Sequence, residues 1–568
     1  MQTRCTKVHG GRMLSQPIRR FGLISLIFLN SFLSRGGEAD LFKQFENRAN
    51  DEVLSREQEL RAFKPKFTKQ DIVKPLVVPK KKAANKEIIV RFQKIEIVGD
   101  SLLVRQDKIK FVKPYLNKAV TLQQLDGLVA KILQWYFDRG FNTTRVGFKE
   151  ESFSEKGVLK IYVVEGKIGK IFIKENGKVR KRFNTVVPFK DGRLFCLRDY
   201  EQAMDNIQRL PSLSAQLDIV PLKDEGNSDV VIKVDKQKPI NFSTGYDNDG
   251  SPTYGQRSYN VGVTFDDLAG LYDMLHVNYH TNERLYKDRY NKTFSALYSV
   301  PCGKHLWSVT YSDARFLTTT QGQVQAIKFE GGTQSLSLDW DYVLQRSRTS
   351  KTQIGLELNH KRIRNEIQGM RQITGCRNLT TLQLKLSHMM QVFRGWMTAT
   401  VRFIRGLRCN SLGVATTIPT TFHKFAGDIS LIEPLGNTPF QWRLQASGQY
   451  SKDRLYGSEQ LSIGGGSTVR GFEEGLYSGE CGGYVRNEIC YRMSPCKLCK
   501  LGINELFVGY DVGRIFRNHT TRDVGTLSGF VCGWRFNGKH LNSEISLSRA
   551  LHPSGKGMFF NFKIGVSF

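Results

Sequence analysis

The last ten residues of the chain alternate between apolar and polar side chains. One face would carry Phe560, Phe562, Ile564, Val566 and Phe568, and the other would carry Asn561, Lys563, Gly565 and Ser567. Because side chains alternate across a β-strand, this pattern predicts a strand with one apolar and one polar face. Such a final strand is typical of a transmembrane β-barrel, whose apolar face contacts lipid and whose other face lines a wet lumen.

The same alternation recurs from about residue 239 onward. Leu336, Leu338, Trp340, Tyr342 and Leu344 share one face, opposite Ser337, Asp339 and Asp341. Residues 442–450 repeat the pattern. A long open sheet would expose its edges, whereas closure into a barrel removes them. At roughly 20 residues for each spanning strand and its connection, residues 239–568 predict an antiparallel barrel of about 16 strands.

Two smaller units with helical as well as strand periodicity precede this region, over residues 88–166 and 167–238. In the first, we expect strands at 88–98, 142–149 and 157–164, and a helix at 121–139 that Thr121 caps and Gly140 ends. In the second, we expect strands at 168–174, 214–221 and 228–235, and a helix at 198–209. The two successive β-α-β-β units make a weak internal repeat.

The N-terminal segment predicts export. Residues 1–39 have the pattern of a signal peptide: Arg19 and Arg20, an apolar stretch at 21–33, and small residues at 37–39. An organelle-targeting helix or an uncleaved anchor is the alternative interpretation. Residues 40–62 predict a polar helix with a weak apolar stripe, and residues 63–87 a basic, proline-containing linker.

The composition argues against two classes of protein, helical membrane proteins and nucleic-acid-binding proteins. No run of about 18 apolar residues is present, which argues against a helical membrane protein. The formal net charge is +31, but the basic residues are spread along the whole chain without a nucleic-acid-binding motif. We therefore expect no nucleic-acid partner. The excess of basic residues has three alternative explanations: a basic lumen, a surface that faces anionic lipid, or an acidic polypeptide that passes through the protein.

The cysteines and histidines give no catalytic pattern. The ten cysteines are scattered, and Cys496-x-x-Cys499 has no second pair at metal spacing. A local disulfide in an oxidising compartment is the favoured interpretation of this pair. The ten histidines show no motif, so we expect no enzyme, metal or cofactor.

One glycine-rich segment, residues 464–472, interrupts the strand pattern. It lacks the Lys-Ser/Thr and the helix of a phosphate-binding loop. An arginine inside a barrel needs an acidic partner, because an unpaired guanidinium in a confined lumen is costly. For Arg470 the candidate is Asp511, in a segment whose glycines would let a loop approach closely.

Residues 468–472, Thr-Val-Arg-Gly-Phe, resemble the Val-Arg-Gly-Phe/Tyr signature of the outer-membrane translocator superfamily, which includes barrel-assembly proteins. The resemblance is closest to the two-partner secretion transporters of the haemolysin-activator type, and covers about residues 40–568. Supporting matches are Val164–Ile168, Tyr136–Phe141, Asp266–Leu271, Gly509-x-Asp511-x-Gly513, Gly533–Phe536 and Gly565–Phe568.

The resemblance implies a 16-stranded barrel in the bacterial outer membrane, two polypeptide-transport-associated domains in the periplasm, and a pore-plugging helix at 40–62. It also implies that residues 464–475 fold back into the lumen. The functional loop residues would be Val469, Arg470, Gly471 and Phe472. Their partners on the barrel wall would be Asp511, Gly513, Arg535 and Phe536, and Phe568 would be a signal for barrel assembly.

The implied function is export of an unfolded partner protein to the cell surface. The implied partners are that secreted protein, outer-membrane lipid and the barrel-assembly machinery. An insertase that assembles other barrels is the alternative, since it shares the signature. A passive porin or an adhesin is a third possibility, against which the two preceding domains argue.

Overall fold

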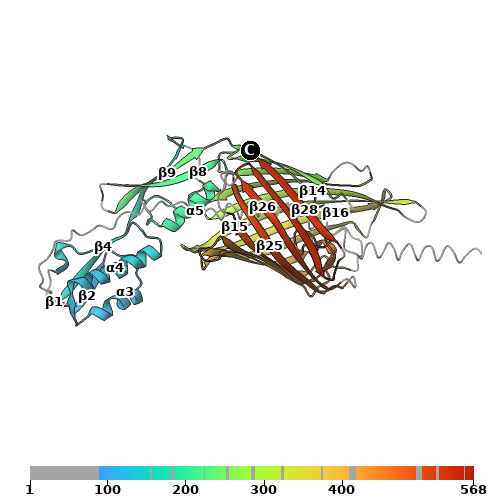
Figure 1. Cartoon of the computed structure of the whole chain (residues 1–568). Helices are drawn as coiled ribbons and strands as arrows, with labels where there is room; N and C mark the ends of the chain where they lie inside the picture. The colour runs from blue at the N-terminus through green and yellow to red at the C-terminus, as the bar shows by residue number, and fades with distance from the viewer. Residues whose placement is uncertain are drawn as a thin grey trace, which may run out of the picture.

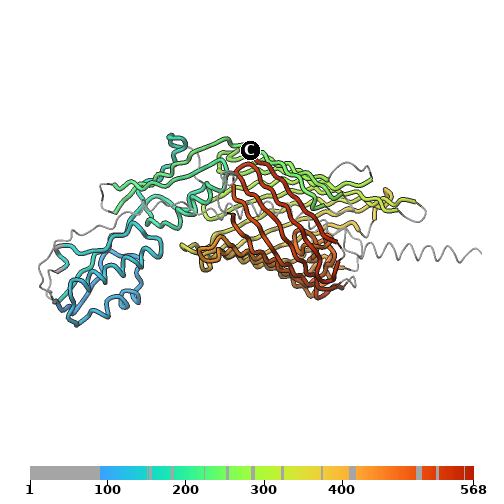
Figure 2. Tube along the Cα trace, viewed as in Figure 1, coloured from blue at the N-terminus to red at the C-terminus, as the bar shows by residue number. Residues whose placement is uncertain are grey.

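The computed structural model describes residues 89–568 except 154–156, 181–184, 223, 225, 251–254, 283–287, 322–324, 373–374, 409–417, 494–501, 520–523 and 556. The predicted signal peptide, 40–62 helix and 63–87 linker, and the Cys496/Cys499 pair, lie outside the described residues. Figures 1 and 2 show two small α/β units followed by a closed β-barrel. No helix in the described part is long and apolar enough to cross a membrane.

The first unit is a three-stranded sheet with helices, ordered β2-β5-β4. Its elements are β1 (Ile89–Arg91), β2 (Lys94–Val98), α3 (Arg105–Val112), the 3-10 turn η1 (Lys113–Tyr115), β3 (Ala119–Thr121), α4 (Leu122–Asp138), β4 (Arg145–Gly147), the 3-10 turn η2 (Glu150–Phe153) and β5 (Val158–Val164). Helix α4 begins with a capping box, in which Thr121 and Gln124 satisfy each other's backbone N–H groups. Its apolar stripe is buried against the sheet.

Two strand predictions for this unit were wrong in detail, and one helix was missed. The strand expected at 88–98 is two strands in different sheets: β1 pairs with β3, and β2 pairs with β5. The break lies where the N–H groups of Gln93 and Lys94 both donate to the Gly157 carbonyl. The strand expected at 142–149 is only the three residues of β4. Helix α3 was not predicted, because it buries Val112 alone and so has little apolar periodicity.

The second unit is a four-stranded sheet ordered β7-β6-β9-β8, covered by one helix. Its elements are β6 (Lys167–Glu175), β7 (Lys178–Val179), α5 (Leu197–Gln208), β8 (Leu213–Pro221) and β9 (Asn227–Lys236). Strands β6 and β9 are parallel, and β8 is an antiparallel edge strand. The predicted strands and helix of this unit match to within one residue.

The remaining long strands form a closed antiparallel barrel. They are β10 (Ile240–Asp247), β11 (Ser258–Asp266), β12 (Met274–Asn282), β13 (Tyr290–Cys302), β14 (His305–Gln321), β15 (Ala326–Arg346), β16 (Ser350–Ile367), β18 (Arg377–Val392), β19 (Gly395–Leu407), β20 (His423–Pro434), β21 (Phe440–Tyr450), β24 (Cys481–Arg492), β25 (Gly502–Arg517), β26 (Thr526–Gly538), β27 (Leu541–His552) and β28 (Met558–Ser567). The two-residue strand β17 (Met370–Arg371) turns back and pairs antiparallel with the end of β16. The predicted fold class, a mainly β protein with a barrel of about 16 strands, is confirmed.

The barrel closes where the last strand meets the first. Strand β28 pairs with β10 over five residue pairs, from Ser243 opposite Ser567 to Asp247 opposite Lys563. The wall has two chemically different faces: Leu336 and Leu338 are half exposed on the outside, whereas Ser335 and Ser337 are buried. The alternation read from the sequence therefore separates a lipid-facing side from a polar lumen side.

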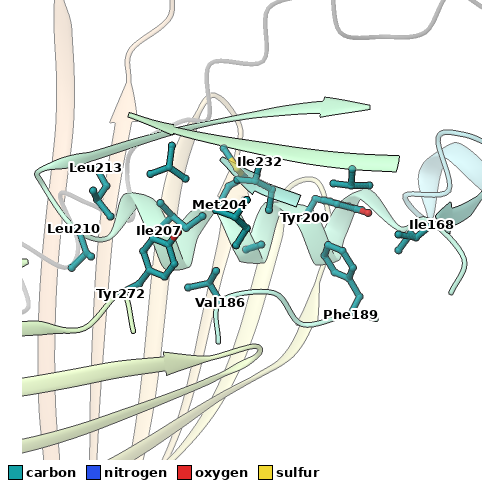
Figure 3. Close-up of a cluster of buried hydrophobic side chains, with 14 of the residues drawn as sticks. Ile168, Val186, Phe189, Tyr200, Met204, Ile207, Leu210, Leu213, Ile232 and Tyr272 are labelled. Carbon is teal, nitrogen blue, oxygen red and sulfur yellow. The ribbon is translucent and has the colours of Figure 1, made fainter. Parts of the chain in front are cut away.

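The second unit is fixed to one end of the barrel. Tyr272, in the turn between β11 and β12, is fully buried in the core of this unit, and Figure 3 shows its ring beside Ile207 of α5. On the same helix, Asp205 accepts hydrogen bonds from Arg346 and Lys351 at the barrel rim. These contacts hold the sheet of the second unit at the mouth of the lumen.

Candidate functional site in the barrel lumen

The segment between β21 and β24, residues 451–480, leaves the wall and folds into the barrel; we call it the fold-back loop. It contains a 3-10 turn, η4 (Gly457–Glu459), and a short hairpin of β22 (Leu461–Ile463) and β23 (Tyr477–Gly479). Its side chains contact inward-facing residues of the wall. Asp511, for example, is completely buried, whereas its neighbour Tyr510 on β25 is half exposed on the outer face.

Arg470, near the tip of the fold-back loop, is held by two acidic residues of the wall. Its Nε lies 2.6 Å from Asp511 Oδ2, its Nη2 lies 2.7 Å from Asp511 Oδ1, and its Nη1 donates to Glu488. The backbone N–H of Arg470 also donates to Asp511 Oδ2 at 3.1 Å. Paired N–H donors on one carboxylate fix orientation as well as position. The structure thus places Arg470 and Asp511 together, as the sequence suggested.

Glu488, on β24, is the contact that sequence reasoning missed. It joins Arg470 to Arg535, whose Nη1 lies 3.6 Å from Glu488 Oε2 and whose Nε donates to Glu544 at 2.8 Å. The Arg535 guanidinium also lies over the ring of Phe507, 4.6 Å from its centre. The alternation of β24 could have identified Glu488 as an inward-facing acid, but only the strand register places it opposite Gly509.

Glycines make room for the loop on the wall. A Cβ at Gly529 would lie 1.9 Å from the Arg470 carbonyl oxygen, and one at Gly513 would lie 2.9 Å from the Val469 side chain. Gly471 has a φ of +93°, a conformation that other residues rarely adopt. The loop can therefore approach the wall this closely only because glycines stand at these wall positions.

Two apolar side chains of residues 468–472 also hold the fold-back loop against the wall. Val469 is fully buried and Phe472 nearly so. They belong to one apolar cluster with residues of the hairpin and of the wall, namely Leu461, Ile463, Ile515, Leu527 and Ala550. Burial of this cluster stabilises the inward position of the loop.

Two of the predicted site residues lie elsewhere. Phe536 follows Arg535 on β26, so it points to the opposite face, where its ring stacks on Trp534. Phe568 lies where the barrel closes, and its backbone pairs with Phe242 of β10. Its ring is exposed and stacks on His540.

Comparison with known protein families agrees with this architecture. The family model "Haemolysin secretion/activation protein ShlB/FhaC/HecB" matches residues 226–536, more than half of the chain. The chain belongs to this family. In the same comparison, residues 90–166 match a "POTRA domain, ShlB-type" and residues 167–221 match a "POTRA domain". These matches fall on the two α/β units, which we call the first and second POTRA units.

The relatives found by sequence include outer-membrane and haemolysin transporters. An "Outer membrane transporter CdiB" of Escherichia coli is 28% identical over 549 residues, which are 94% of this chain and 91% of the relative. The "Hemolysin transporter protein ShlB" of Serratia marcescens is 27% identical over 76% of this chain and 77% of the relative. The chain is therefore a two-partner secretion transporter of the bacterial outer membrane, with its POTRA units in the periplasm.

Solved structures show the same fold. The structure of "CdiB from Escherichia coli" superposes with a TM-score of 0.83 at 26% identity, and covers 94% of this chain and 99% of that one. The structure of "CdiB from Acinetobacter baumannii" superposes with a TM-score of 0.76, covers 94% of this chain and 99% of that one, and at 21% identity supports the fold alone.

Proposed function

We propose that this transporter captures an extended, unfolded partner protein at a sheet edge of its POTRA units and passes it through the barrel lumen to the cell surface. The observation that carries the proposal is the place of edge strand β8. The N–H of Ser212, just before β8, donates to Asp266 on the barrel rim at 3.0 Å. A chain added to the edge of β8 would therefore lie beside the mouth of the lumen.

The backbone of β8 supports such pairing. The Leu213 N–H bonds to the Leu210 carbonyl, and the Ala215 carbonyl accepts from the Gln208 side chain. These residues therefore direct their polar groups away from β9. Since alternate residues of a strand share this direction, Leu217 and Ile219 also present their N–H and C=O groups at the outer edge. Strand addition at such an edge recognises main chain rather than sequence, which suits an unfolded substrate.

Passage would follow once the 40–62 helix leaves the pore. In this proposal the fold-back loop, held by Arg470 and Asp511, shapes the lumen through which the partner moves, with the four residues 469–472 at its tip. Neither Arg470 nor Asp511 carries out a chemical step. Folding of the partner outside the cell would prevent its return and so give the movement its direction.

A proline substitution tests the edge. Ile219→Pro removes one outward N–H but keeps the pairing of β8 with β9, because edge strands accept proline on their free side. The matched control, Ile219→Ala, removes the same side chain and keeps the N–H. We expect Ile219→Pro to lower the amount of partner in the medium, and its photo-crosslinking to β8, well below the Ile219→Ala level. Equal secretion and crosslinking by the two variants would contradict capture at this edge.

A further inference from the structure

The fold-back loop has a second charged contact with the wall, far along the sequence from its tip. Glu459, in η4, is 4% exposed, and its Oε2 lies 2.7 Å from the Nζ of Lys424 on β20. Its Oε1 lies 3.3 Å from the Nζ of Lys361 on β16. Two lysines from separate strands thus share one carboxylate.

The backbone of Glu459 is held as well as its side chain. Its carbonyl oxygen accepts from Lys424 Nζ at 3.1 Å and from Gln449 Nε2 at 2.9 Å. Lys424 itself is only 6% exposed. A buried carboxylate that loses its cationic partners is strongly destabilising, so this position of η4 depends on the two lysines.

The two charged contacts use different parts of the wall. The partners of Glu459 are on β16, β20 and β21, whereas those of Arg470 are on β24 and β25. Since the wall runs β16-β18-β19-β20-β21-β24-β25, the loop is fastened on both sides of the point where it leaves the barrel. Each charged contact therefore holds a different half of the loop against the wall.

We propose that Glu459 is a positioning residue, which with Lys361 and Lys424 anchors the base of the fold-back loop and thereby keeps Arg470 seated on Asp511. The inference deepens the proposed function, in which the loop shapes the transport path. Its test needs no partner protein, so its failure can be told apart from failure of the transport proposal.

Trypsin can report the position of the loop directly. Arg470 is the one lysine or arginine between Arg454 and Arg486, and it is buried in the seated loop. Cleavage after Arg470 in the full chain, reconstituted in lipid vesicles, therefore requires the loop to leave its seat. When opening and closing are fast relative to cleavage, the rate follows the population of the open form.

We expect Glu459→Gln to be cut after Arg470 about tenfold faster than the unaltered chain, which corresponds to about 1.4 kcal/mol in the opening equilibrium. The matched control is Asp428→Asn, an inward-facing acid on β20 whose cation, Arg402, lies on neighbouring β19. It should be cut at the unaltered rate. Glu459→Gln cleavage at the control rate would overturn the proposal.

A charge exchange separates positioning from general loss of stability. Glu459→Lys combined with Lys361→Glu and Lys424→Glu places one ammonium group between two carboxylates and so restores both ion pairs with reversed charges. We expect its cleavage rate to return toward that of the unaltered chain. A folded exchange variant that is cut as fast as Glu459→Gln would contradict the proposal. If Glu459→Gln does not form a heat-modifiable barrel, Lys361→Met, which removes the longer contact, must show the faster cleavage in its place.

Discussion

The guanidinium of Arg470 lies on the carboxylate of Asp511, with two side-chain hydrogen bonds of 2.6 and 2.7 Å between them. Glu488 occupies the remaining arm of the guanidinium. Because all three groups are buried, the loop that carries Arg470 has one well-defined position in the lumen.

Replacing Arg470 should abolish secretion. Arg470→Ala leaves the carboxylates of Asp511 and Glu488 without their shared cation, a cost of about 3–5 kcal/mol for a buried pair. Arg470→Lys should give an intermediate level, since an ammonium cannot form the paired bonds of a guanidinium. The measurement is the amount of partner protein in the medium, together with the heat-modifiable barrel in the outer membrane. Loss of the barrel itself, in place of loss of secretion alone, would assign the pair a purely structural role.

Gly529 gives a second test of the seated loop. In Gly529→Ala the new Cβ would lie 1.9 Å from the Arg470 carbonyl oxygen, so the loop must move. We expect faster tryptic cleavage after Arg470 and lower secretion. Gly427→Ala is the control, because its Cβ would lie 3.6 Å from the Thr400 carbonyl oxygen, an ordinary contact. If the two variants behave alike, the close approach between loop and wall at Gly529 is not needed.

The attachment of the second POTRA unit should depend on pH through Asp267, in the turn after β11. Burial by itself raises the pKa of the Asp267 carboxyl, but hydrogen bonds from Lys236 and the Tyr272 N–H, with the charge of Arg180, lower that pKa overall. A carboxyl whose pKa is lowered in the attached state stabilises that state above its ordinary value of 3.8. The contribution is lost as the pH falls through the lowered pKa.

Energy transfer between dyes on non-natural residues at the exposed positions 179 and 393 would follow this attachment. Between pH 7 and pH 4 the transfer should stay constant, and it should fall at lower pH. Asp267→Asn should lower the transfer already at pH 7 and flatten the acid transition. An acid transition of unchanged size in Asp267→Asn would show that another group controls the attachment.

The predicted plug at residues 40–62 has a direct electrical test. In planar bilayers, the mature chain should give a small or flickering conductance, and deletion of 40–62 should give a wide, steady one. Equal conductance in the two proteins would remove the plug from the transport mechanism.

Alternation along the strands was sufficient to predict the barrel, because one face of each strand must contact lipid. It placed Leu336 and Leu338 outside and Ser337 inside, as the structure has them. The helices of the POTRA units followed from equally simple periodicity, apart from α3. Short or weakly amphipathic elements were missed, since little burial distinguishes them in the sequence.

The lumen contacts could be predicted only in part. Arg470 and Asp511 were recognisable because an arginine next to glycine inside a barrel needs an acidic partner. Glu488 and Glu459 were not, because their partners depend on strand register and on where the loop folds, neither of which alternation specifies. Phe536 was assigned to the site with Arg535 because both belong to the Gly533–Phe536 match, although adjacent strand residues point to opposite faces.

Translocation by the purified chain is the most direct test of the central claim. The chain would be placed in lipid vesicles with its POTRA units outside. It would be given the N-terminal segment of a candidate secreted partner protein, held unfolded in urea and then diluted. We predict that this segment becomes protected from added protease inside the vesicles, and that Arg470→Ala prevents the protection. No protection, combined with faster membrane assembly of an added barrel precursor, would contradict export and support the insertase alternative.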